Sequence, residues 1–160
     1  MLTLAQFLHA ELERLHRGLD RSLEDLTPEQ LHTLPGGHPK ANTIAWGLWH
    51  YARTEDNVVR WVLQDRRPSV WTEGGYPEKL GLPPVAQGTG MPTAEAQALR
   101  IKDVPLFKEY VQKVWESTGE FLGSTAIIVM CGAFFFKTSP TPVMVPPVPM
   151  PATNASSSPL

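Results

Sequence analysis

Cysteine and clustered charge are both scarce in this chain. A single cysteine, Cys131, stands among 160 residues, which excludes an internal disulfide and fits a reducing, cytoplasmic compartment. The 14 basic and 16 acidic residues give a net charge of −2, and no basic block occurs. Because phosphate neutralisation needs clustered Lys and Arg, the composition argues against nucleic acid as a partner. The N-terminus has no cationic segment before its apolar residues, which argues against a secretory signal peptide.

Charge is absent from the C-terminal end of the sequence. The 23 residues after Lys137 contain no charged side chain, but they contain seven of the sixteen prolines and a serine run. Proline removes a backbone donor and fixes φ, so residues 138–160 are predicted to be a disordered, Pro/Ser-rich tail outside the domain.

The segment before this tail is apolar and has no helical pattern. Residues 121–136 form an uncharged run of 16 residues. A membrane-spanning helix needs about 20 apolar residues, so a tail anchor is disfavoured and no membrane partner is expected. We predict that residues 124–137 form a buried or poorly packed apolar segment.

Helical periodicity is what the rest of the chain contains. Leucines at three- and four-residue steps predict an amphipathic helix over residues 4–26, in which His9 and His16 are expected to face solvent. A second long helix is predicted at about 43–64 and a third from Asp103 to about Leu122. The sequence therefore indicates three substantial helices in an all-α fold.

Capping residues and helix-breaking residues mark the ends of these helices. Thr27, with proline and glutamine one and three residues later, predicts a capping-box start for a short helix. Asn42 is the expected N-cap of the second long helix, and Thr93 the expected cap of another short one. Residues 65–92, rich in Gly and Pro, are predicted to be a long irregular loop.

The stretch "ANTIAWGLWHYARTEDNVVRWVL" at 41–63 resembles the second-helix pattern of the DinB/YfiT-like superfamily. The pattern has a small-polar start, an aromatic and aliphatic body, a histidine, and then Arg-x-Glu-Asp. "LEDLTPEQLHTLP", "GTGMPTAEAQALR" and "YVQKVWESTGEFL" support it in the expected order. The resemblance covers residues 1–123 and implies an up-down-down-up four-helix bundle, with the last helix missing or replaced by residues 124–137.

The resemblance also implies a divalent metal, zinc or nickel, held by three histidines in many members. One histidine comes from the second helix, where His50 matches by position, and two come from an H-x-x-x-H pair on the last helix. No histidine follows His50 in this chain, so an incomplete metal site is expected. The implied pocket around it would include Trp46, Trp49, Arg53, Glu55 and Asp56.

Structural alternatives exist for each of these residues. His50 is also explained as an interior histidine hydrogen-bonded to a helix or loop group. Arg53 could pair with Asp56 or Asn57, and Glu55 with a basic residue of another helix, as ordinary bundle ion pairs. The tryptophans could be core residues or pocket walls.

Two functions remain open from the sequence. The first is a metal-dependent enzyme of the thiol-transferase or hydrolase type, with His50 as one ligand. The second is a non-catalytic, degenerate bundle that associates with another chain or with itself, for instance as a homodimer. The abrupt change after Gly123 prompts the hypothesis of a shifted reading frame, which translation of the other two frames would test.

Overall fold

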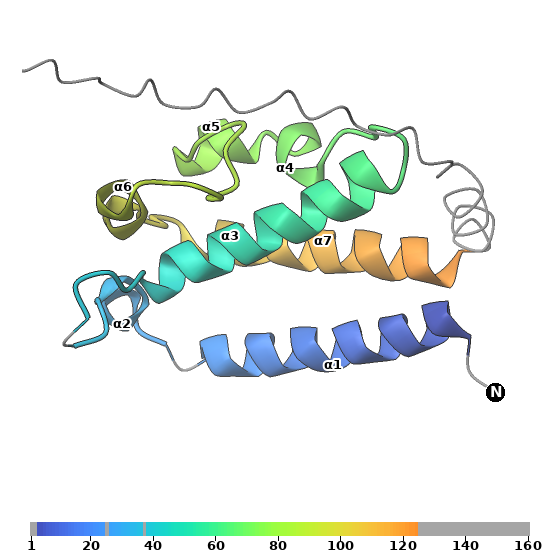
Figure 1. Ribbon diagram of the computed structural model, residues 1–160, viewed down its shortest axis with the longest axis horizontal. Helices are drawn as coiled ribbons and strands as arrows, with labels where there is room; N and C mark the ends of the chain where they lie inside the picture. Colours follow the sequence, from blue (N-terminus) through green and yellow to red (C-terminus); the bar gives the residue numbers. More distant parts are fainter. Residues whose placement is uncertain (1–2, 25, 37, 125–160) are drawn as a thin grey trace, which may run out of the picture.

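The computed structural model describes residues 3–24, 26–36 and 38–124, and every regular element in them is helical (Figure 1). In chain order they are α1 (Leu4–Glu24), α2 (Pro28–His32), α3 (Ile44–Asp56), the π-helix η1 (Asn57–Val62), α4 (Val70–Glu73), α5 (Tyr76–Leu80), α6 (Thr93–Ala98) and α7 (Val104–Gly123). The predicted all-α fold is therefore confirmed.

Two predicted segments fall outside this part of the chain. They are the apolar segment 124–137, except for Ser124, and the tail 138–160. Most of the stretch considered as a membrane anchor, residues 121–136, lies outside the described residues as well. Among the helices of the described ranges, none is long and apolar enough to cross a membrane.

The three long helices form the frame of the molecule. α7 packs against both α1 and α3, and α1 runs antiparallel to the other two (Figure 1). This arrangement has the up-down-down order that was predicted for the first three helices of the bundle. The short helices α4 and α5 lie against α7 on the side away from α1 (Figure 1).

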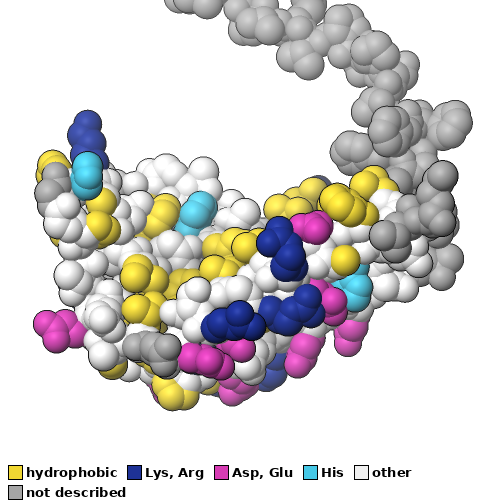
Figure 2. All heavy atoms as spheres, turned by 90° about the horizontal axis from the view of Figure 1, so that it is seen from below, with side chains coloured by type: hydrophobic (Ala, Val, Ile, Leu, Met, Phe, Trp, Pro, Cys, Tyr) yellow, Lys and Arg dark blue, Asp and Glu magenta, His cyan; other side chains and the backbone are white. Residues whose placement is uncertain are grey.

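The hydrophobic core lies between α3, α7 and the α4–α5 segment, and α1 contributes little to it. Its largest fully buried side chains are aromatic and come from α3, α4, α5 and α7: Trp49, Trp71, Tyr76 and Tyr110. The only buried residue of α1 is His16, whereas Leu4, Phe7, Leu8 and Leu15 remain exposed. Figure 2, which views the molecule from the α1 side, shows hydrophobic side chains at the surface beside charged ones. The apolar stripe of α1 is thus only partly covered.

Two of the four predicted helix caps are confirmed. Thr27 forms the complete capping box with Gln30, and the Asp103 carboxylate accepts from Leu106 N at 2.9 Å. Two predictions were wrong by one residue. Thr43, not Asn42, caps α3 by accepting from Trp46 N, and Thr93 is the first residue of α6 after Pro92.

The second long helix differs from the prediction in its last turns. Instead of continuing as an α-helix to residue 64, the chain widens into η1, where Leu63 N donates to Val58 O. The loop predicted at 65–92 contains α4 and α5. Asp65 and Arg66 adopt positive φ values of 50° and 63° and turn the chain back toward the core.

Candidate functional site

His50 lies half-buried on α3, and its imidazole is held by two neighbours. The ring of Trp46, one helical turn earlier, stacks on it with centroids 4.8 Å apart. His50 Nδ1 lies 2.5 Å from the carbonyl oxygen of Gln87. Because a carbonyl only accepts, Nδ1 carries the proton and donates, which leaves the lone pair on Nε2.

A tight loop brings Gln87 to this position. Asn57 Nδ2 donates to Gln87 Oε1 at 2.6 Å, so the same residue is bound to the helix through its side chain and its backbone. Gly88 follows with φ +99°, and a Cβ built on it would lie 2.9 Å from His50 Nδ1. The close approach of the loop to the imidazole therefore requires a glycine at position 88.

A buried polar network connects α1, α3 and α7 on another side of α3. His16 Nε2 lies 3.0 Å from Glu55 Oε2 and 3.1 Å from the Tyr51 hydroxyl oxygen. Tyr51 donates to Glu55 Oε2 at 2.5 Å, and Thr118 donates to Glu55 Oε1 at 2.6 Å. Because Tyr51 gives its only proton to Glu55, both neighbours of His16 Nε2 act as acceptors, and Nε2 carries a proton.

The network shifts the pKa values of its members in opposite directions. Burial alone would raise the pKa of Glu55, but the hydrogen bonds from His16, Thr118 and Tyr51 outweigh it and lower that pKa. The pKa of Tyr51 is raised, first by burial and then by the hydrogen bond to the Glu55 carboxylate. Glu55 is thus held as a carboxylate, and Tyr51 as a neutral hydroxyl.

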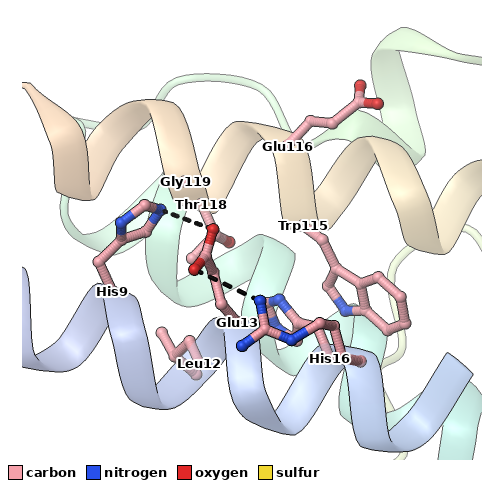
Figure 3. A pocket seen from close by; sticks show the side chains of 9 residues that line it. His9, Leu12, Glu13, His16, Trp115, Glu116, Thr118 and Gly119 are labelled. Atoms are coloured by element: carbon pink, nitrogen blue, oxygen red, sulfur yellow. Dashed lines mark ion pairs between the residues drawn. The ribbon is translucent and has the colours of Figure 1, made fainter.

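A cavity of about 290 Å³ opens beside this network, between α1 and α7. His9, Glu13 and His16 face it from α1, and Trp115 and Thr118 from α7 (Figure 3). The Trp115 ring stacks on the His16 imidazole with centroids 4.6 Å apart. His16 therefore has one nitrogen in the network and lines a cavity with the same ring.

Asp56, the residue after Glu55, has a structural task. Its Oδ1 accepts from Val70 N at 2.8 Å, and its Oδ2 from Trp71 N at 2.9 Å and from the Tyr110 hydroxyl at 3.2 Å. Burial raises the pKa of Asp56, which these hydrogen bonds and the Arg53 charge only partly oppose. Asp56 therefore fixes the start of α4 against α3 and α7.

The residues of the predicted pocket have different surroundings in the structure. Trp46 stacks on His50, which binds the Gln87 carbonyl, whereas Glu55 faces α1 and α7, and Asp56 faces α4. Trp49 is a core residue with no exposed surface. The ion pair suggested for Arg53 with Asp56 is present, with 3.5 Å between Nη1 and Oδ2.

Sequence reasoning missed three participants: His16, Gln87 and Gly88. His16 was expected in solvent, but it is buried and hydrogen-bonded to Glu55. Its spacing from Leu12 and Leu19, four and three residues away, places it within the apolar stripe of α1 and could have identified it. For Gln87 and Gly88 the only signal was the Gly-Thr-Gly sequence in an otherwise uninformative loop.

Comparison with known proteins gives a match at the level of a family. No curated protein matches the chain. The family model described as the DinB superfamily matches residues 11–126, which include α1 from its third turn, His50 with its partner Gln87, and all of α7. This match covers most of the chain, and the all-helical structure of the described residues agrees with the family assignment. The chain therefore belongs to the DinB superfamily.

Proposed function

We propose that this DinB protein binds a divalent metal ion, zinc or nickel, through Nε2 of His50. The supporting observation is the hydrogen bond from His50 Nδ1 to the Gln87 carbonyl. Metal-ligating histidines characteristically donate their second ring nitrogen in this way, which fixes the ring and leaves the other nitrogen free to coordinate. An interior histidine with a purely structural role would more often have both nitrogens satisfied, and Nε2 of His50 makes no hydrogen bond to the described residues.

The remaining donors do not complete a site within the described ranges. Among residues 3–24, 26–36 and 38–124, no group of three or more His, Cys, Asp or Glu side chains could hold a metal ion. By sequence, the residues after 124 include one cysteine and no His, Asp or Glu. The His50 imidazole can serve as one metal ligand, but the described residues do not supply the other protein ligands of a complete site. Further ligands would therefore be water, a thiol substrate or another copy of the protein.

The activity class that accompanies this proposal is a thiol transferase or hydrolase. A bound zinc or nickel ion would lower the pKa of a coordinated thiol or water molecule and so make it nucleophilic. No reaction step follows from His50 alone.

Calorimetric titration of the purified chain with zinc tests the proposal, with nickel in parallel. We expect weak binding at one ion per chain, lost in His50→Ala and retained in His38→Ala. His38 is an exposed loop residue and is the matched control. Equal zinc binding by the two variants would refute the role of His50.

A second function, self-association as a homodimer, has an observation of its own. Exposed apolar side chains lie on α1, such as Leu8 and Leu15, and on the end of the second long helix, such as Val58 and Val62. Light scattering behind gel filtration should show a concentration-dependent dimer that Leu8→Lys or Val62→Lys weakens. Val85→Lys, which changes an exposed valine of the 81–92 loop, should leave it unchanged. A monomer at all concentrations would exclude this function.

A further inference from the structure

A second cavity, of about 540 Å³, lies between the end of α3, η1, α4 and the loop around residue 85. It is lined by Arg53, Asn57, Trp61, Pro68, Ser69, Thr72, Pro84 and Val85. Arg53 is the only charged residue among these, and none of them is acidic. The cavity therefore combines one cation with polar and apolar walls.

Arg53 is buried without enough acceptors. Only 2% of the surface of Arg53 is exposed, and neither Nε nor Nη1 has a hydrogen-bond partner in the described part of the chain. Asp56 is the carboxylate paired with it, at 3.5 Å, but its oxygens already accept from Val70 N, Trp71 N and the Tyr110 hydroxyl. The face of Trp71, with its centroid 5.1 Å from the guanidinium carbon, gives the charge a cation–π contact and no acceptor lone pair.

A buried donor without an acceptor is costly, and the cost is greater for a charged group. The guanidinium is a rigid, planar fork that matches the two oxygens of a carboxylate. Nε and Nη1 have almost no accessible surface, but Arg53 lines the cavity, so a small shift of the guanidinium toward it would let an entering anion supply the missing acceptors.

The residues that line the cavity indicate which chemical group accompanies the negative charge of the ligand. Trp61, Pro84 and Val85 offer apolar surface, and half of the Trp61 side chain is exposed. Asn57, Ser69 and Thr72 add polar atoms. We propose that this cavity binds a small organic carboxylate, with the carboxylate at Arg53 and an apolar body against Trp61 and Pro84.

This site is distinct from the proposed metal site, although Asn57 lines the cavity and also donates to Gln87, the partner of the His50 imidazole. His50 does not line the cavity, and Arg53 takes no part in the hydrogen bonds that hold the imidazole. Carboxylate binding can therefore be present or absent whatever the result of the zinc titration.

Calorimetric titration of the full chain with benzoate tests the proposal, with benzamide as the neutral control of the same shape. We expect saturable benzoate binding with a Kd on the order of 1 mM, a reasonable affinity for so small a ligand. Benzamide and inorganic phosphate should each bind at least about tenfold more weakly, since benzamide lacks the charge and phosphate lacks the apolar body. Benzamide binding as tight as benzoate, or phosphate binding that is tighter, would overturn the proposal.

Two substitutions locate the binding. Arg53→Met removes the cation and should abolish benzoate binding, with circular dichroism reporting whether the helices are retained. Val85→Glu leaves the buried interior intact, because Val85 is 83% exposed, and places a negative charge at the cavity. It should weaken benzoate binding about fivefold by charge repulsion, whereas Val62→Glu, on η1 outside the cavity, should not. Equal benzoate affinity in these two glutamate variants would refute this location even if Arg53→Met does not fold.

Discussion

His16 of α1 and Glu55 of α3 form a buried hydrogen bond, with 3.0 Å between Nε2 and Oε2. It joins two helices whose apolar contact is limited, because His16 is the only buried residue of α1. Breaking a buried, hydrogen-bonded pair from one side leaves the partner unsatisfied. The pair is therefore expected to add to the attachment that α1 has through its packing against α7.

Acid should weaken this attachment through Glu55. Its pKa is lowered in the folded state relative to the ordinary value of 4.5, so its contribution to stability is complete above that value and is lost as the pH falls through the lowered pKa. Glu55→Gln cannot titrate. We expect the free energy of unfolding of this variant to be about 1–3 kcal/mol lower at neutral pH and to decline less steeply below about pH 4.5.

Urea denaturation from neutral pH down to about pH 3 measures both effects. Glu13→Gln is the matched control, since Glu13 is an exposed acid of α1 paired only at 3.7 to 3.9 Å with Arg17 and His9. Identical acid slopes for the two glutamine variants would contradict the role assigned to Glu55.

Asp56→Ala should be far more destabilising than Asp103→Ala, although both residues accept backbone N–H bonds at the start of a helix. Asp56 is buried, binds Val70 N and Trp71 N, and lies beside the Arg53 cation. Its loss leaves that cation without a carboxylate, for an expected cost of about 3–5 kcal/mol. Asp103 is exposed and caps α7 through one bond, for about 1 kcal/mol. Chemical denaturation that ranks the two variants equally would disprove this interpretation.

The parts of this fold that could be predicted depend on neighbours in sequence. The helix over 4–26, observed at Leu4–Glu24, follows from its leucine spacing, and the capping box at Thr27 from residues three apart. The third long helix begins at a proline-containing turn capped by Asp103, again a local signal.

The parts that could not be predicted depend on distant residues. The α4 helix begins where Asp56, fourteen residues earlier, accepts its first amides, and no local pattern reveals that bond. The same holds for His50, whose partner Gln87 is 37 positions away in a loop without periodicity. The membership of His50 in a family pattern marked its position, while only the structure shows which nitrogen is engaged.

Two fully buried tryptophans should respond differently to the same substitution. Neither Trp49 nor Trp71 has exposed surface, but Trp71 Nε1 donates to the Pro83 carbonyl at 3.2 Å, whereas Trp49 Nε1 has no partner in the described residues. Phenylalanine removes similar volume at both sites. Trp71→Phe also leaves the Pro83 carbonyl without its donor, whereas Trp49→Phe removes an N–H that has no acceptor. Trp71→Phe should therefore be more destabilising by about 1–2 kcal/mol. Thermal and urea unfolding provide the comparison, and a larger loss for Trp49→Phe would refute it.

Gly88→Ala should disturb the His50 imidazole specifically, and Gly90→Ala supplies the matched control. Both glycines have positive φ, +99° and +73°, so alanine strains the backbone at each by about 1–2 kcal/mol. Only at Gly88 does the new methyl group meet a neighbour, 2.9 Å from His50 Nδ1 and 3.2 Å from Trp46 Cζ2. At Gly90 nothing lies within 4 Å. The overlap should add a further cost of about 1–3 kcal/mol, as overpacking of a filled site does, and it should push Gln87 away from the imidazole.

In NMR spectra, the His50 ring signals should then shift in Gly88→Ala and remain unchanged in Gly90→Ala. Because the Gln87 bond sets the tautomer that leaves Nε2 free, zinc binding should weaken in parallel with the ring shift. Unchanged ring signals in Gly88→Ala would show that the loop does not control the imidazole.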